Sequence, residues 1–187
     1  MDTEIVLVKQ WIQEAVIGLN LCPFARPVYD RNQIFYIVSK AKDPESLLKV
    51  FHSELHRLEK SSIDEVATTI WILPTLPEFE DFLDIVSLMD SFLDQTPLRG
   101  VYQLASFHPQ YQFEGTETQD LQNFTNRAPY PIIHIIREED ITRAAKFFGD
   151  TSKIPETNIR TLEDLGQEKV KNLFKRFSPS TASHKEK

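Results

Sequence analysis

The sequence predicts a single α/β domain: a small mixed sheet of about four strands, mostly parallel, with helices packed on it. Short runs rich in β-branched and aromatic residues alternate with longer segments whose apolar residues recur at helical spacing. This alternation is typical of strand–helix–strand units with right-handed crossovers. The chain has 187 residues, which fits one core. We expect the domain to span residues 1–177 and a disordered tail to follow at 178–187, where few apolar residues occur.

The first expected element is an amphipathic helix over residues 3–19. Its apolar residues recur every three or four positions, and Gly18 is expected to end it. Residues 20–32 follow as a loop that carries Pro23 and Pro27.

Three strands separated by two helices come next. Strands are predicted at 33–39, 67–73 and 101–107, each a short run of β-branched and aromatic residues. The first helix begins at Asp43, a typical N-cap residue followed by proline, and the second covers 77–94. We expect these strands to run in the same direction, with a ligand site beyond their carboxyl ends.

The second half of the chain begins with a polar, non-periodic segment at 110–130, a length that is more often functional than accidental. An isoleucine-rich run at 132–137 is predicted as a fourth strand, whose direction the sequence leaves open. Helices are expected at 138–148 and 155–177, and the second has a potential break at Gly166.

Composition excludes several classes of protein. Hydrophobic residues make up 41% and charged residues 26%, and the net charge of -7 disfavours nucleic acid as a partner. The five glycines are too far apart for either common nucleotide-binding loop, and one cysteine excludes an intramolecular disulfide and a CxxC pair. No apolar run is long enough for a transmembrane helix, and the acidic N-terminus is unlike a signal peptide. We therefore expect a cytoplasmic protein without membrane partners.

Cys22, the single cysteine, is a candidate nucleophile or metal ligand. A reactive thiolate needs a cation or metal nearby, and Arg26 is the nearest cation in sequence. The alternative is a small buried hydrophobic residue under the loop.

Two histidines are candidates for a role beside Cys22. His108 follows a predicted strand, where it is placed to act as a general base or metal ligand, or to bond backbone carbonyls. His134 shares a strand face with isoleucines, which suggests a hydrogen-bonded core histidine. A set of Cys22, His108 and His134 would suit zinc or another divalent transition metal, although their spacing does not specify such a site.

Arginines flank the PYP segment at 129–131. Arg127 and Arg137 are candidates for an anion clamp, because guanidinium groups bind carboxylates and phosphates bidentately. Arg137 precedes two glutamates, so a structural ion pair is favoured there, whereas Arg127 lies in the long polar segment. Two further histidines, His52 and His56, lie one turn apart on a predicted helix and are expected to be exposed.

Four segments resemble motifs of one bacterial protein family. GLNLCPFA, ASFHPQYQFEGT, NRAPYPIIHIIRE and NIRTLEDLG occur in that order, and the resemblance to the family called domain of unknown function 1415 covers residues 8–166. The family pattern has Ser where Ala128 stands and usually Thr where Ile132 stands. The resemblance implies no particular reaction. The residues with reactive or polar side chains that match the family motifs are Cys22, His108, Tyr111, Gln112, Asn126, Arg127, His134 and Arg137.

The resulting functional hypothesis is a cytoplasmic enzyme, dependent on a metal or on cysteine, that acts on a small anionic molecule. Its alternatives are a non-catalytic module that binds a ligand or a protein, and a purely architectural role for the motifs. The oligomeric state is not determined. The enzyme hypothesis assigns catalysis to Cys22, His108 and Tyr111, ligand binding to Arg26, Gln112, Asn126, Arg127 and Arg137, and metal binding to Cys22, His108 and His134.

Overall fold

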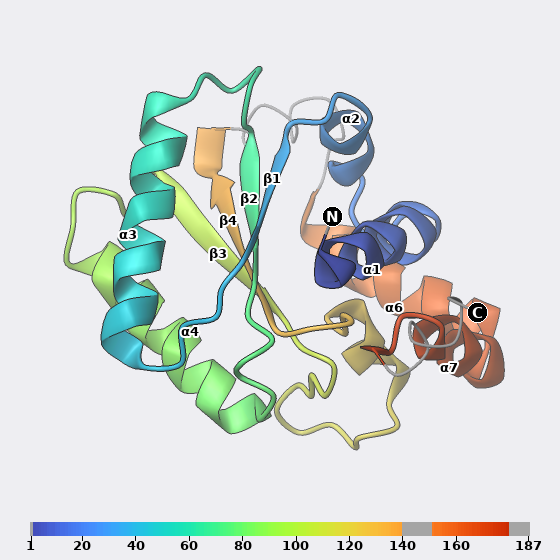
Figure 1. Ribbon diagram of the computed structural model, residues 1–187. Helices are drawn as coiled ribbons and strands as arrows, with labels where there is room; N and C mark the ends of the chain where they lie inside the picture. The colour runs from blue at the N-terminus through green and yellow to red at the C-terminus, as the bar shows by residue number, and fades with distance from the viewer. Residues whose placement is uncertain (1, 140–150, 180–187) are drawn as a thin grey trace.

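A computed structural model describes residues 2–139 and 151–179 and confirms an α/β fold (Figure 1). A four-stranded sheet in the order β1-β2-β4-β3 lies between helices on its two faces. The strands are β1 (Ile34–Val38), β2 (Thr68–Ile72), β3 (Tyr102–Phe107) and β4 (Ile132–Arg137), within a residue or two of the predicted bounds.

The sheet is mixed, and the expectation of mostly parallel pairing was wrong. β1 and β2 pair in parallel, whereas β4 is antiparallel to both β2 and β3. The first three strands do run in the same direction, but β4 lies between β2 and β3. Its isoleucines explain the position: Ile132, Ile133 and Ile135 are fully buried on alternating faces, and only a central strand buries both faces.

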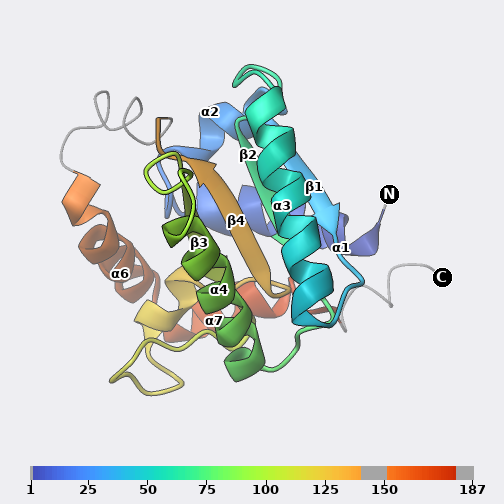
Figure 2. The ribbon, with the colours of Figure 1, turned by 90° about the vertical axis from the view of Figure 1, so that its left-hand side faces the viewer.

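Two helices cover one face of the sheet (Figure 2). These are α3 (Pro44–Lys60) and α4 (Phe79–Asp94), which pack the larger core against Trp71 and its neighbours. The predicted N-cap is confirmed, because Asp43 Oδ1 accepts a 2.8 Å hydrogen bond from the Ser46 amide.

The opposite face is covered mainly by the N-terminal and C-terminal helices. α1 (Thr3–Trp11) continues into a π-helical stretch, η1 (Ile12–Ile17), and the Trp11 ring packs edge-on against Phe107 at 5.3 Å. Near the C-terminus, α6 (Ile154–Leu165) and α7 (Gln167–Lys175) are separated by Gly166 at φ 86°. The predicted break is confirmed, because this left-handed backbone favours glycine.

The first helix ends as predicted: η1 ends at Ile17 with Gly18 as its C-cap, and the chain then turns at Asn20. Asn20 has φ 52°, and the Leu21 amide donates a 2.8 Å hydrogen bond to the Val16 carbonyl, as in a Schellman cap. Gly18 itself keeps helical angles. A Cβ at this position would lie 2.1 Å from the Glu14 carbonyl oxygen, so only glycine fits the wide π turn.

Other short elements complete the described chain. The prediction of a loop over all of 20–32 was wrong, because α2 (Ala25–Asp30) forms there; Pro27 falls in its first turn, where no backbone amide is needed for an intrahelical bond. Short 3-10 helices occur at η2 (Leu121–Thr125) and η3 (Thr151–Lys153). Most of the helix predicted at 138–148, and the tail from residue 180, lie outside the described residues. Within the described parts, no helix combines the length and apolarity needed to cross a membrane.

One edge of the sheet is the natural place for a site. Val38, Ile72 and Phe107, the last residues of β1, β2 and β3, lie in register with Ile132, the first residue of β4. The long connection 108–131 leaves and re-enters the sheet at this edge, as the carboxyl-end rule predicts for a ligand site.

Candidate functional site

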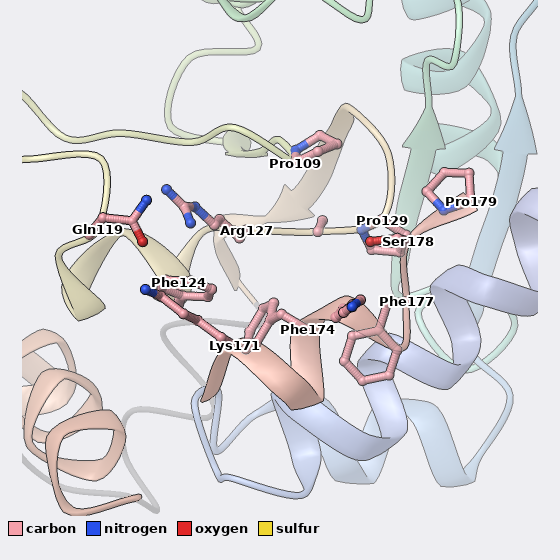
Figure 3. Close-up of a pocket in the computed structure, with 12 residues that line it drawn as sticks. Pro109, Gln119, Phe124, Arg127, Pro129, Lys171, Phe174, Phe177, Ser178 and Pro179 are labelled. Atoms are coloured by element: carbon pink, nitrogen blue, oxygen red, sulfur yellow. The ribbon is translucent and has the colours of Figure 1, made fainter. Parts of the chain in front are cut away.

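A groove of about 300 Å³ lies between the 108–131 connection and α7 (Figure 3). We call it the basic groove, because its polar lining includes three cationic side chains and no acidic one. Polar residues lining it are Gln119, Arg127, Lys171, Lys175 and Ser178, and apolar ones are Pro109, Phe124, Ala128, Pro129, Phe174, Phe177 and Pro179.

Arg127 is held in a fixed orientation in this groove. Its Nε donates to the Tyr111 carbonyl at 3.3 Å and its Nη2 to the Thr118 carbonyl at 2.7 Å. The guanidinium carbon lies 4.2 Å from the centre of the Phe124 ring, in a cation–π contact. Desolvation by burial lowers the pKa of Arg127. These contacts use two of its five N–H groups, so donors remain for an anion.

Lys171 and Lys175 supply the other two charges. They lie one turn apart on α7 and are both exposed. In residues 2–139 and 151–179, neither lysine makes an ion pair with a carboxylate, and neither does Arg127. The groove therefore gathers three cations without acidic partners in a chain that carries more acids than bases.

Asn123, a residue that the sequence interpretation missed, organises the segment next to the groove. This fully buried side chain accepts hydrogen bonds at Oδ1 from the Phe113 amide (3.0 Å) and the Thr116 hydroxyl (2.9 Å). Its Nδ2 donates to the Glu117 carbonyl at 2.8 Å. Asn123 thus ties together the turn that precedes η2. In the sequence, the feature that could have identified Asn123 is its position next to Phe124 in an otherwise polar segment.

Three predicted site residues also support the connection but do not line the groove. Asn126 Nδ2 donates to the Ser106 carbonyl at 3.1 Å, and Gln112 Nε2 donates to the Thr116 carbonyl at 2.5 Å. The Tyr111 ring packs among neighbouring phenyl rings, while its carbonyl orients Arg127. These three residues therefore hold the 108–131 connection in place and are positioned to orient Arg127, but they would not contact a ligand in the groove themselves.

Comparison with known families supports the motif resemblance. A family model described as Protein of unknown function (DUF1415) matches residues 4–172. The chain belongs to the DUF1415 family. No curated protein and no solved structure matches it. The family match includes Arg127 and Lys171 and ends before Phe174 and Lys175, so it covers part of the groove.

His108 of this DUF1415 protein is buried beside α4, where its ring packs at 5.1 Å from Phe79 and 5.3 Å from Phe82. Its Nδ1 accepts a 3.1 Å hydrogen bond from the Gln110 amide. Nε2 has no well-formed hydrogen bond, and backbone carbonyls at 76–77 are its nearby acceptors. Burial lowers the pKa of His108 despite these carbonyls. His108 begins the connection after β3 and lies against residues 76–77 of the connection after β2, so its ring holds these two connections together.

His134 lies on the other face of the sheet. Its Nε2 is 2.6 Å from the Thr68 hydroxyl oxygen, and that hydroxyl donates to the Ile135 carbonyl at 2.6 Å. Because Thr68 has one hydroxyl proton, Nε2 of His134 must carry the ring proton and donate. Burial lowers the pKa of His134 to about 4, so the ring is neutral at pH 7.

This environment predicts pH-dependent stability. The unfolded chain binds the His134 proton near pH 6.5 and the folded chain only near pH 4, so acidification across this window favours unfolding. We expect the free energy of unfolding to fall by about 2 kcal/mol more between pH 7 and pH 5 in the natural chain than in a His134→Gln variant. Urea unfolding at both pH values measures this difference. Equal losses in the two proteins would contradict the assignment, since His108 titrates in both.

The predicted three-ligand set is not assembled in the described structure. His134 shares a sheet face with Ala105, its β4–β3 partner, whereas His108 contacts α4 on the opposite face. Cys22 lies between η1 and α2, where desolvation by burial raises the pKa of its thiol. No group of three or more His, Cys, Asp or Glu side chains that could hold a metal occurs in residues 2–139 and 151–179.

The remaining predicted positions also lie away from the groove. Arg26 is exposed on α2. Arg137 lies at the far end of β4, where its Nη2 donates to the Leu58 carbonyl and, at 2.9 Å, to the Ser61 carbonyl. It therefore holds the end of α3 to the sheet. His52 and His56 are exposed, as expected.

Proposed function

We propose that this DUF1415 protein binds a small organic anion in the basic groove. The observation that carries the proposal is the convergence of Arg127, Lys171 and Lys175, which have no acidic partner in the described residues. Three cations that line one groove repel one another, and an anionic ligand relieves that repulsion. Bacterial origin and a cytoplasmic location are part of this proposal, on the family resemblance and the single cysteine.

The charge of the whole chain restricts the ligand to a small one. A net charge of -7 repels a long polyanion, whose affinity depends on many phosphate contacts over an extended surface. A compact anion interacts mainly with the groove and meets three nearby positive charges. A ligand with about two negative charges would be matched best.

The proposal follows the binding-module alternative and not the enzyme hypothesis. Cys22, His108 and His134 come from separate environments, and His108 and His134 lie on opposite sheet faces. Arg127, in contrast, has its Nε and Nη2 fixed by backbone carbonyls while other N–H groups stay available. Preorganised donors of this kind favour anion binding.

The test uses inorganic phosphate as the probe. We expect phosphate to shift the NMR signals of Arg127 and Lys171 in a saturable way. Replacing both lysines in a Lys171→Gln, Lys175→Gln variant should weaken phosphate binding about tenfold, because two neighbouring charges are lost.

The matched control is a Lys60→Gln, Lys169→Gln variant. It changes the net charge equally at two exposed lysines that do not line the groove. If the control weakens phosphate binding as much as the groove variant, or if the shifts do not saturate, the proposed site is wrong.

A further inference from the structure

We infer that the anion bound in the basic groove carries an aromatic ring, and that its chemical class is an aryl phosphate monoester. This inference rests on the proposed function and specifies its ligand. It depends on three features of the groove: the donors at its charged side, the rings at its apolar side, and its size.

The charged side suits a phosphate group. Nε and Nη2 of Arg127 are oriented by the carbonyls of Tyr111 and Thr118, which leaves three N–H donors of the guanidinium group. Lys171 and Lys175 add two ammonium groups. A phosphate monoester is close to dianionic at neutral pH and offers several acceptor oxygens, so it uses these donors better than a monocarboxylate.

The apolar side suits a ring. Figure 3 shows Gln119 and Arg127 on one side of the groove, next to Phe124, and Phe177 and Pro179 on the other, next to Ser178. The guanidinium group of Arg127 at one side and the rings of Phe177 and Pro179 at the other match a ligand with an anionic head and an apolar body. Inorganic phosphate would leave the apolar part of the groove without a partner.

Phe174 presents the ring surface against which a ligand can pack. It is partly accessible, whereas Phe124 and Phe177 are buried at 5% and 1% exposure. The Phe174 ring stands at 77° to Phe124 and at 80° to Phe177, with centroids 5.2 and 6.0 Å apart. These edge-on contacts fix its orientation, and a fixed ring favours an aromatic ligand over a flexible alkyl chain.

The volume of the groove limits the size of the ligand. A volume of about 300 Å³ is at the lower end for small-molecule sites, which suits one ring with a phosphate group. The exposed ring of Pro109 belongs to the same lining and offers a second apolar contact.

Titration calorimetry of the full chain with three compounds tests the inference. We expect phenyl phosphate to bind at least tenfold more tightly than inorganic phosphate and at least threefold more tightly than cyclohexyl phosphate. In a Phe174→Leu variant the ratio of phenyl phosphate affinity to inorganic phosphate affinity should fall at least threefold. Pro109→Ala, at an exposed position, should lower the same ratio at least twofold.

A Phe113→Leu variant is the control, because Phe113 is an exposed ring that does not line the groove. Its affinity ratio should equal that of the natural chain. Equal binding of phenyl and inorganic phosphate overturns the inference and leaves the proposed function standing. Equal binding of phenyl and cyclohexyl phosphate overturns the aromatic requirement. No saturable binding of any of the three compounds overturns the proposed function itself.

Discussion

An Asn123→Ala variant is expected to lose about 2 to 3 kcal/mol of unfolding free energy and most of its anion affinity. The substitution removes three hydrogen bonds from a fully buried position and leaves the Phe113 amide and the Glu117 carbonyl without their partner. The affected turn also includes Thr118, whose carbonyl orients Arg127. Urea unfolding and phosphate titration measure the two losses.

Gln122→Ala is the matched control, since this neighbouring amide is only partly buried and does not line the groove. We expect its unfolding free energy to stay within about 0.5 kcal/mol of the natural value. An Asn123→Ala protein that is destabilised but binds phosphate normally would show that the turn does not position Arg127.

An Arg137→Met variant is expected to lose about 3 kcal/mol of unfolding free energy without any change in phosphate affinity. Nη2 of Arg137 donates to carbonyls at the end of α3, from Leu58 and Ser61, and to the Val66 carbonyl at 3.4 Å. Methionine keeps the apolar stem but leaves these carbonyls without a donor. The groove stays intact because Arg137 lies at the opposite end of β4 from Ile132.

Arg160→Met provides the comparison for Arg137. Arg160 is an exposed arginine on α6 that forms an ion pair with Glu156 at 3.5 Å, and such surface pairs contribute little. We expect its replacement to change the unfolding free energy by less than about 0.5 kcal/mol. If Arg137→Met is no more destabilising than Arg160→Met, or if it weakens phosphate binding, Arg137 is not a purely structural residue.

Local signals predicted most of the fold. Asp43 caps a helix because its carboxylate bonds the Ser46 amide, and Gly166 separates two helices because its backbone is left-handed. Both effects involve residues a few positions apart, so the sequence pattern contains them. The helix end at Gly18 was predicted, but the left-handed turn at Asn20 just after it was not, because glycine is the more usual residue at such angles.

Only one residue that lines the basic groove, Arg127, was predicted as a site residue. Arg127 stands in a long polar segment, which marked it as a candidate, and Asn126 beside it anchors the connection. Lys171 and Phe174 were missed, because on an amphipathic helix a lysine looks like an ordinary solvent-facing residue and a phenylalanine like an ordinary core residue. They lie more than forty positions from Arg127, and no sequence period links them to it.

The sequence by itself determined most of the segments that become strands and helices, α2 excepted, because apolar spacing, caps and turn residues act over short distances. Tertiary structure decided the rest. It inserted β4 between β2 and β3, placed His108 and His134 on opposite sheet faces, and brought α7 to Arg127. The physical reason is that burying both faces of an isoleucine-rich strand is a property of the whole sheet. Strand order then fixes which distant side chains meet.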